Sequence, residues 1–295
     1  MSNEAMKKEA EKYGIPFEKH GRQLVWHDEF DEGSINWDNW SFDRTMNGKD
    51  RIYDNSEKCC RIEGDKLLLQ AHRNDDPNYP YRLSEGFTTK RTMLFKYGYV
   101  EMRACPPYHH GAWPSFWTQS KTPFSKANWF SEFDIFEIFS DNQRAKSCVH
   151  KWNDTRHCAA SGGQFDSGER YKFHDWENLN NEYHIYAMEW DESFVSFMVD
   201  DEVYCKVPID AENGNFGADV IDGVQGFHDF SYIIMNDEIF TPNGGWIVPG
   251  WSITKNDKLP FNYYIDYVRL YQNPEKEEIK LKDEIQAALE AESKK

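Results

Sequence analysis

The sequence predicts an all-β chain, an antiparallel β-sandwich with a short helix at each end. Short runs in which apolar and polar residues alternate recur between turn residues from about position 23 to 272. No long segment with the helical period interrupts them, which favours antiparallel sheets over alternating strands and helices. Outside this region the composition becomes charged and helix-forming. We therefore divide the chain into an N-terminal helical extension (1–22), a β body (23–272) and a C-terminal helix (273–295).

The N-terminal extension is predicted to hold one charged helix over residues 3–13. Gly14 follows it directly, and Pro16 prevents easy continuation. The first residues lack the apolar core of a secretory signal. Either a signal was removed or the protein is made without one.

Several runs in the body match half-buried strands. Residues 194–207 form a predicted hairpin that turns at Asp200 and Asp201. Trp190 is expected in the core. Other predicted strands span residues 23–30, 66–72, 97–103 and 183–190.

The C-terminal segment switches to Glu, Lys, Ala and Leu after Pro274. One weak apolar stripe predicts an amphipathic helix that packs on the body or on the N-terminal helix. The stripe consists of Ile279, Ile285, Ala288 and Leu289.

The amino-acid composition favours some classes of binding partner and argues against others. Of the 295 residues, 16% are aromatic, with 11 Trp and 16 Tyr, a surplus typical of an interaction surface or a sugar-stacking cleft. The net charge of −17 argues against nucleic acid or an anionic membrane as partner. No apolar run is long enough to span a membrane. The six cysteines form no metal-type C-x-x-C pair, so free thiols are expected.

Three acids lie within the apolar run Ser131-Glu-Phe-Asp-Ile-Phe-Glu-Ile-Phe-Ser140. In a strand, Glu132 and Asp134 share one face, whereas strict alternation puts Glu137 on the other. A bulge of one extra residue would return Glu137 to the side of the other two acids. The residues left for the buried face are then Phe133, Ile135 and Ile138.

Crowded carboxylates of this kind suit glycoside hydrolysis. A retaining enzyme needs two carboxylates about 5 Å apart, one as nucleophile and one as acid/base. Crowding raises one pKa, so that one acid stays protonated beside an ionised neighbour. A calcium site or a solvated acidic face is the alternative, but calcium loops are rich in Gly and Asn rather than Phe and Ile. We favour the catalytic interpretation.

Several segments together resemble glycoside hydrolase family 16, the laminarinase, lichenase and agarase group with a concanavalin-like jelly roll. Glu132-Phe-Asp-Ile-Phe-Glu137 matches the bulged signature E-x-D-x-x-E of that family. The resemblance covers roughly residues 23–272, and its other segments occur in the family's order. They are Leu24–Phe30, Lys96–Arg103, Gly111–Trp117 and Tyr263–Tyr271.

The resemblance implies a role for each acid. Glu132 would be the nucleophile and Glu137 the general acid/base. Asp134 would hydrogen-bond Glu132 and set the charge of the pair. The reaction would retain the anomeric configuration and need no cofactor.

The resemblance also implies substrate contacts. Trp113 and Trp117 would line the cleft, although core positions are the alternative. His150 falls where the family often places a histidine that reaches toward the acid/base, and a structural role is equally open. Weaker substrate candidates are Asn55, Trp129, Trp152, Asn236 and Trp246.

Many family members hold a structural calcium on the convex side. Glu29, Gly64 and Asp266 match the positions of its ligands, and oxygen ligands suit Ca²⁺. The alternative is that the two acids only satisfy backbone donors.

We hypothesise an endo-acting β-1,3(4)-glucanase, because Gly-x-Trp-Pro-x-x-Trp is more similar to glucanases than to agarases. Residues 115–119 and 232–245 depart from the usual glucanase pattern. A galactan hydrolase of the agarase or carrageenase type, a non-catalytic lectin and a transglycosylase are the alternatives. The family implies a polysaccharide partner, a monomer and a secreted or periplasmic location, while the missing signal leaves a cytoplasmic one open.

Overall fold

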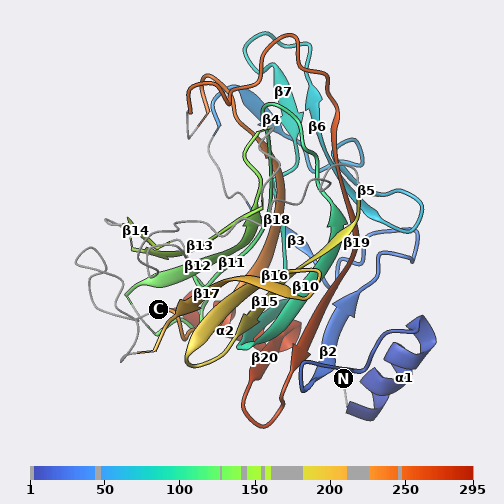
Figure 1. The fold of residues 1–295 in the computed structure, drawn as a ribbon, viewed down its shortest axis with the longest axis vertical. Helices are drawn as coiled ribbons and strands as arrows, with labels where there is room; N and C mark the ends of the chain where they lie inside the picture. The colour runs from blue at the N-terminus through green and yellow to red at the C-terminus, as the bar shows by residue number, and fades with distance from the viewer. Residues whose placement is uncertain are drawn as a thin grey trace.

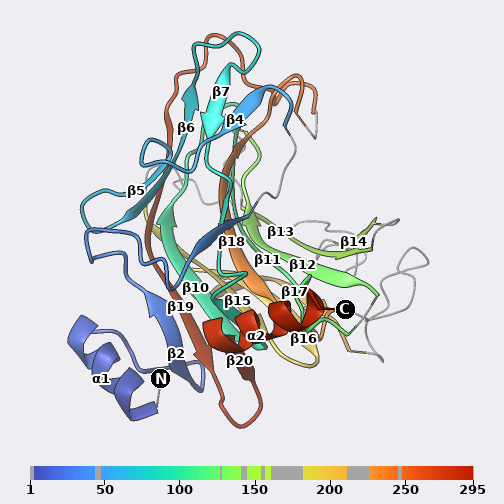
Figure 2. The same cartoon turned by 180° about the vertical axis from the view of Figure 1, so that it is seen from behind.

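The computed structural model describes most of the chain and contains two mainly antiparallel sheets that pack face to face (Figure 1). This confirms the predicted jelly-roll sandwich. A helix lies at each end of the chain, one beside each sheet (Figures 1 and 2). The described residues are 3–43, 48–126, 128–140, 145–153, 157–160, 182–210, 226–244 and 248–294.

The larger sheet is built around the long strand β19, which pairs with β10 along one edge. Along the other edge, β19 pairs first with β6 and then with β2. In order across the sheet, the strands are β17 (Glu202–Pro208), β16 (Phe194–Val199), β15 (His184–Trp190), β10 (Gly98–Cys105), β19 (Phe261–Gln272), β6 (Leu67–Arg73), β7 (Tyr81–Leu83) and β4 (Arg51–Tyr53). Attached to this path are β1 (Glu18–Lys19), β2 (Arg22–Asp28) and β5 (Cys60–Ile62).

The smaller sheet carries the acidic strand near its centre. Its order is β14 (His157–Ala160), β13 (Lys146–Trp152), β12 (Phe130–Glu137), β11 (Ala112–Gln119), β18 (Tyr232–Ile239), β8 (Gly86–Thr88) and β3 (Ser41–Asp43). A separate ribbon pairs β9 (Met93–Lys96) with β20 (Glu278–Leu281).

The predicted hairpin at residues 194–207 is confirmed as β16 and β17. Asp200 and Asp201 form its turn with φ angles of 50° and 64°. Two consecutive residues with positive φ are typical of the two-residue turns that match the twist of a hairpin.

The core between the sheets is rich in aromatic rings, and their packing fixes the position of β12. Phe133 packs on Trp190 with ring centroids 5.4 Å apart, and Phe136 lies 4.2 Å from Tyr186. All four side chains are fully buried, so the prediction of Trp190 as a core residue is confirmed. Because buried aromatic rings dominate core energetics, this contact holds the inner face of β12 against the larger sheet.

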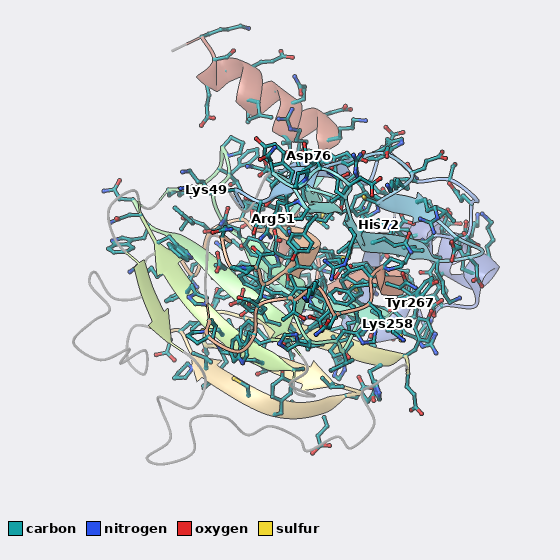
Figure 3. All side chains as sticks on the ribbon, turned by 90° about the horizontal axis from the view of Figure 1, so that it is seen from above. Lys49, Arg51, His72, Asp76, Lys258 and Tyr267 are labelled. Carbon is teal, nitrogen blue, oxygen red and sulfur yellow. The ribbon has the colours of Figure 1, made fainter. Side chains whose placement is uncertain are left out.

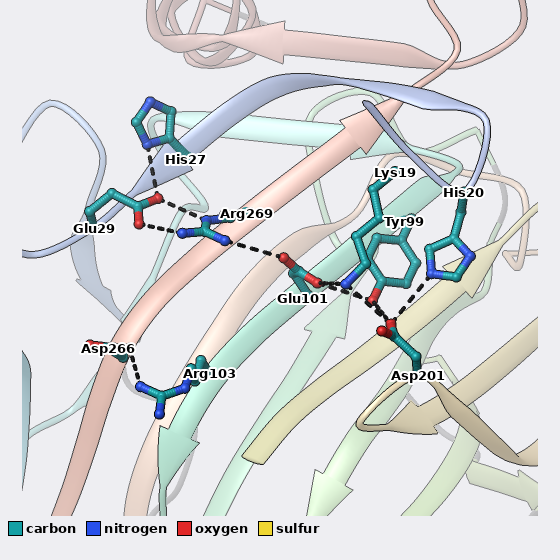
Figure 4. Close-up of polar contacts among 10 residues, drawn as sticks. All are labelled: Lys19, His20, His27, Glu29, Tyr99, Glu101, Arg103, Asp201, Asp266 and Arg269. Atoms are coloured by element: carbon teal, nitrogen blue, oxygen red, sulfur yellow. Dashed lines mark hydrogen bonds and ion pairs between the residues drawn. The ribbon is translucent and has the colours of Figure 1, made fainter. Parts of the chain in front are cut away.

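The predicted N-terminal helix is confirmed as α1 (Asn3–Tyr13). Gly14 ends it with a φ of +67°, a conformation that favours glycine. Met6 and Ala10 pack on the outer face of the larger sheet. Lys19 continues this contact, since its Nζ lies 2.6 Å from Oε2 of the buried Glu101 (Figure 4). The extension is thus part of the convex surface of the sandwich.

The prediction of one helix over residues 273–295 was partly wrong. Ile279 lies in β20, and only α2 (Lys282–Glu292) is helical. Pairing with β9 provides hydrogen-bond partners for the backbone of this segment. This stabilisation outweighs the weak helical pattern of its side chains. In α2, Ile285 and Leu289 pack near Ile234 on the smaller sheet and not on α1 (Figure 2).

Within the described residues, no helix combines the length and apolar character that a membrane crossing requires. Five cysteines of this part of the chain are free thiols, as expected. They are Cys59, Cys60, Cys105, Cys148 and Cys205.

Asp237 of β18 is an acid inside the sandwich, and its only described contact is the backbone N–H of Ala71, 3.1 Å from Oδ2. Burial raises the pKa of Asp237 well above its ordinary value. The folded protein therefore holds this proton at pH values where the unfolded chain has lost it, and stability falls as pH rises above about 4.

We expect Asp237→Asn to increase stability at pH 8 by roughly 1–3 kcal/mol, because asparagine mimics the neutral acid. The gain should shrink toward pH 4. Urea unfolding at the two pH values measures it, with the exposed Asp65→Asn as the matched control. An equal gain at both pH values would contradict the assignment of a neutral Asp237.

Candidate active site

The predicted bulge is present in β12. Between Asp134 and Glu137, this strand has one residue more than either neighbouring strand. Ile135 and Phe136 are both fully buried in the core as a result. Glu137 therefore returns to the face that carries Glu132 and Asp134. The structure brings the three acids together on the outer face of the smaller sheet.

Strand β13 places a second row of functional groups opposite these acids. The ladder partners are Lys146 for Glu137, Cys148 for Asp134 and His150 for Glu132. Two basic side chains and one thiol thus face three carboxyl groups. Sequence reasoning missed Lys146 and Cys148, although alternation along the strand from His150 would have found both.

His150 forms an ion pair with Asp134, with 2.9 Å between Nε2 and Oδ2. Burial by itself lowers the pKa of His150, but the charge of Asp134 and its hydrogen bond raise it well above the ordinary value. His150 is therefore an imidazolium at neutral pH. Its charge also lowers the pKa of the predicted partner Glu137.

Burial, followed by the charge of Asp134, raises the pKa of Glu132 and of Glu137 to about 8 each. A hydrogen bond from Gln119 acts in the opposite direction on Glu132. The charge of Lys146 and a hydrogen bond from Trp113 likewise lower the pKa of Glu137. Since the two glutamates repel each other when both are ionised, one of them keeps a proton near neutral pH. This is the charge state that a nucleophile and a general acid require.

Both predicted cleft tryptophans lie on the face of the acids. Trp113 Nε1 donates to Glu137 Oε1 at 2.9 Å, and its ring stacks on Phe240 with centroids 4.8 Å apart. Trp117 Nε1 donates to Oδ1 of Asn236 at 2.8 Å. Trp113, Trp117 and Asn236 therefore belong to one surface beside the acids.

The two stretches that depart from the glucanase pattern are paired in space. Gln119 of β11 is the ladder partner of Tyr232 of β18 and, on its other side, of Glu132. The hydroxyl of Tyr232 donates to Gln119 Oε1 at 2.6 Å. This leaves the Gln119 amide N–H groups for Glu132. Gln119 could have been found by continuing the alternation from Trp113 through Trp117.

A buried ion pair lies at the other end of this surface. Glu238, the ladder partner of Trp113, is bound by the guanidinium of Arg51. The hydroxyl of Tyr53 lies 3.2 Å from Glu238 Oε2, and Thr241 accepts a further bond from Arg51 at 2.8 Å. Figure 3 labels Arg51 in a view onto this end of the molecule. Sequence reasoning did not identify this group.

The remaining substrate candidates are scattered. Trp152 lies 6.1 Å from His150 between ring centroids, whereas Trp129 is buried beneath Lys151. Asn55 is exposed and exchanges hydrogen bonds with Glu85. Trp246 lies outside the described residues.

The residues predicted for calcium do not fit that ion. Arg269 donates to both carboxylate oxygens of Glu29, at 3.0 and 2.7 Å. Asp266 is paired with Arg103 (Figure 4). It is also paired, at 3.3 Å, with Lys66. Gly64 forms a tight turn with a φ of +69°. Because three cations already neutralise the two acids, the described arrangement does not fit a calcium ion, and the calcium site stays a prediction.

We therefore expect calcium to leave stability unchanged. The melting temperature should be the same within about 1 °C in EDTA and in millimolar CaCl₂, since a ligand stabilises a fold only through its own binding. Differential scanning fluorimetry measures this, with Arg269→Gln as the matched variant that frees Glu29. A calcium-dependent increase of several degrees in the wild type would overturn this expectation.

Comparison with known proteins identifies the family to which the chain belongs. Residues 39–222, more than half of the chain, match the model of glycosyl hydrolases family 16. The chain belongs to this family. Its relatives include the glucan endo-1,3-beta-glucosidase A1 of Niallia circulans, which is 26% identical over 85% of this chain and 38% of its own length. The beta-glucanase of Rhodothermus marinus is 26% identical over 85% of each chain.

One similar solved structure has a TM-score of 0.70 and 26% identity, covering 88% of this chain and 94% of its own. It is described among endo-acting O-glycanases with which members of the human gut microbiota initiate mucin breakdown. The chain spans little more than a third of the length of two curated relatives that it matches.

Proposed function

We propose that the protein is a retaining endo-glycoside hydrolase that acts on β-glucan with 1,3 or mixed 1,3-1,4 linkages. Family membership and the names of the two glucanase relatives support the reaction and the substrate class. The single observation that carries the mechanism is the bulge, which brings Glu132, Asp134 and Glu137 onto one face.

In the proposed mechanism, Glu132 attacks the anomeric carbon and Glu137 protonates the leaving oxygen. The indole of Trp113 orients Glu137 by its hydrogen bond. His150 holds Asp134, and burial together with the negative charge of Asp134 keeps one proton on the pair Glu132 and Glu137. Glu137 then deprotonates a water molecule, which releases the sugar from Glu132 with its configuration retained.

The aromatic surface fits a polysaccharide. The C–H faces of sugar rings pack on indole rings, and Trp113 and Trp117 flank the acids on the same sheet. A polysaccharide substrate, a monomeric enzyme and secretion or export to the periplasm belong to this proposal.

Release of reducing sugar from laminarin and from barley glucan tests the substrate. We expect cleavage of at least one of them, with a series of oligosaccharides that indicates endo action. Agarose and carrageenan are the controls. Cleavage of these galactans alone would reject the glucanase and favour the galactan alternative.

A second candidate is an endo-acting O-glycanase. The solved structure with a TM-score of 0.70 favours it. The same assay with mucin as substrate distinguishes the two. Release of oligosaccharides from mucin, with laminarin and barley glucan intact, would replace the first proposal by this one.

A further inference from the structure

Cys148 stands in the row of polar groups that faces the catalytic acids, although the proposed reaction has no use for a thiol. It is the ladder partner of Asp134 and is 2% exposed. Its neighbour His150 points to the same side of β13, because alternate residues of a strand share a face. A sulfur, an imidazole nitrogen and a carboxylate oxygen therefore converge at the centre of the site.

The three atoms lie within 4.8 Å of one another, and His150 Nε2 is 2.9 Å from Asp134 Oδ2. Tetrahedral zinc with bonds of about 2.0–2.3 Å needs ligand atoms roughly 3.3–3.6 Å apart. Small side-chain rotations bring the observed positions to these separations. Asp134 and Cys148 are buried by the surrounding sheet, so both are already ordered.

We infer that Asp134, Cys148 and His150 form a binding site for a thiophilic divalent cation such as Zn²⁺, and that its occupation inhibits the enzyme. Thiolate and imidazole ligands select zinc, cobalt and copper over calcium and magnesium. Three protein ligands leave the fourth position to water or to Glu132, which faces His150 across the ladder.

Binding would exchange the thiol proton of Cys148 and the proton of His150 for the metal. The cation would take Asp134 away from His150 and lie between the two glutamates. It would also occupy the space through which a sugar ring reaches Glu132. Inhibition therefore follows from position and charge together, and this part of the inference rests on the proposed function.

Cobalt spectroscopy tests the site without any substrate. Desalted wild-type protein titrated with Co²⁺ should develop the near-ultraviolet charge-transfer band of a cobalt–thiolate bond, and Zn²⁺ should remove it. Cys148→Ser and Cys148→Thr should lack the band, while Cys105→Ser, a control at another free thiol, should keep it. A wild-type spectrum without a thiolate band would overturn the inference.

Inhibition is measured on the glucan that the enzyme cleaves. Zn²⁺ should lower the wild-type rate at least about tenfold, EDTA should restore it, and Ca²⁺ and Mg²⁺ should have no effect. For each variant, the rate is compared with its own zinc-free rate. Cys148→Ser should need at least about tenfold more Zn²⁺ for half-inhibition.

Equal zinc sensitivity in Cys148→Ser and the wild type would overturn the inference. The two proposals fail in different ways. A cobalt–thiolate band in a protein that cleaves no glucan rejects the glucanase and supports the metal site. Glucan cleavage by a protein without the band supports the glucanase and rejects the metal site.

Discussion

Replacing Glu132 by alanine is expected to reduce glucan hydrolysis by at least about 10³-fold, because the substitution removes the carboxylate that forms the glycosyl ester in the proposed mechanism. Azide should restore turnover of a dinitrophenyl β-laminaribioside, since the small anion fits the space left by the carboxylate. Azide attacks from the side of the missing nucleophile, so the product should be the α-glycosyl azide. The anomeric configuration is determined by proton NMR.

Glu132→Gln is the control for folding and binding. Because the pKa of Glu132 is raised to about 8 in the folded protein, ionisation opposes folding as pH rises from about 4.5 to 8. The glutamine variant should therefore be at least as stable as the wild type at pH 8 and should still bind laminarin. If wild type and variant both bind glucan and neither hydrolyses it, the protein is a lectin.

Replacing Glu137 by alanine should give a loss that depends on the leaving group. Hydrolysis of laminarin should fall at least about 10³-fold, since its leaving alcohol needs a proton. Formation of the glycosyl ester from the dinitrophenyl substrate should be nearly unaffected, because dinitrophenolate leaves without protonation. Azide should then yield the β-glycosyl azide, as Glu132 still forms the ester. Burst kinetics separate the two steps.

The pH profile provides the control for this assignment. Burial and the charge of Asp134 raise the pKa of Glu137, so the wild-type kcat/KM should decline only as pH rises through about 8. Glu137→Ala should lose this alkaline limb in its residual hydrolysis of laminarin, whose leaving alcohol needs the proton. Retention of the limb would assign the titration to another group and contradict Glu137 as the acid.

In the candidate site, a local sequence pattern predicts only those contacts that form between residues close in sequence. The acids Glu132, Asp134 and Glu137 are close in sequence, so one bulge is enough to bring them together. That bulge was predictable because Glu137 would otherwise enter an aromatic core, where an unpaired charge is strongly unfavourable. Gln119 and Tyr232 are more than a hundred residues apart, and only the ladder between β11 and β18 makes them neighbours.

Two expectations depended on partners from distant segments, which the local sequence does not reveal. Glu29 and Asp266 resemble calcium ligands in sequence, but Arg269 and Arg103 reach them from adjacent strands. Ile279 fits a helical pattern of apolar residues, yet its segment pairs with the edge of β9 and forms a strand. Charge pairing and edge pairing both depend on which strands lie side by side.

By itself, the sequence determined the sandwich class, several strands of the body, the catalytic strand and its bulge, because each follows from alternation and from the avoidance of buried charge within one segment. The tertiary structure alone decided which cations hold the convex acids, where the C-terminal segment packs, and which groups face the three carboxylates. Those choices depend on strand order and register, which bring Lys146, Cys148 and His150 opposite the acids.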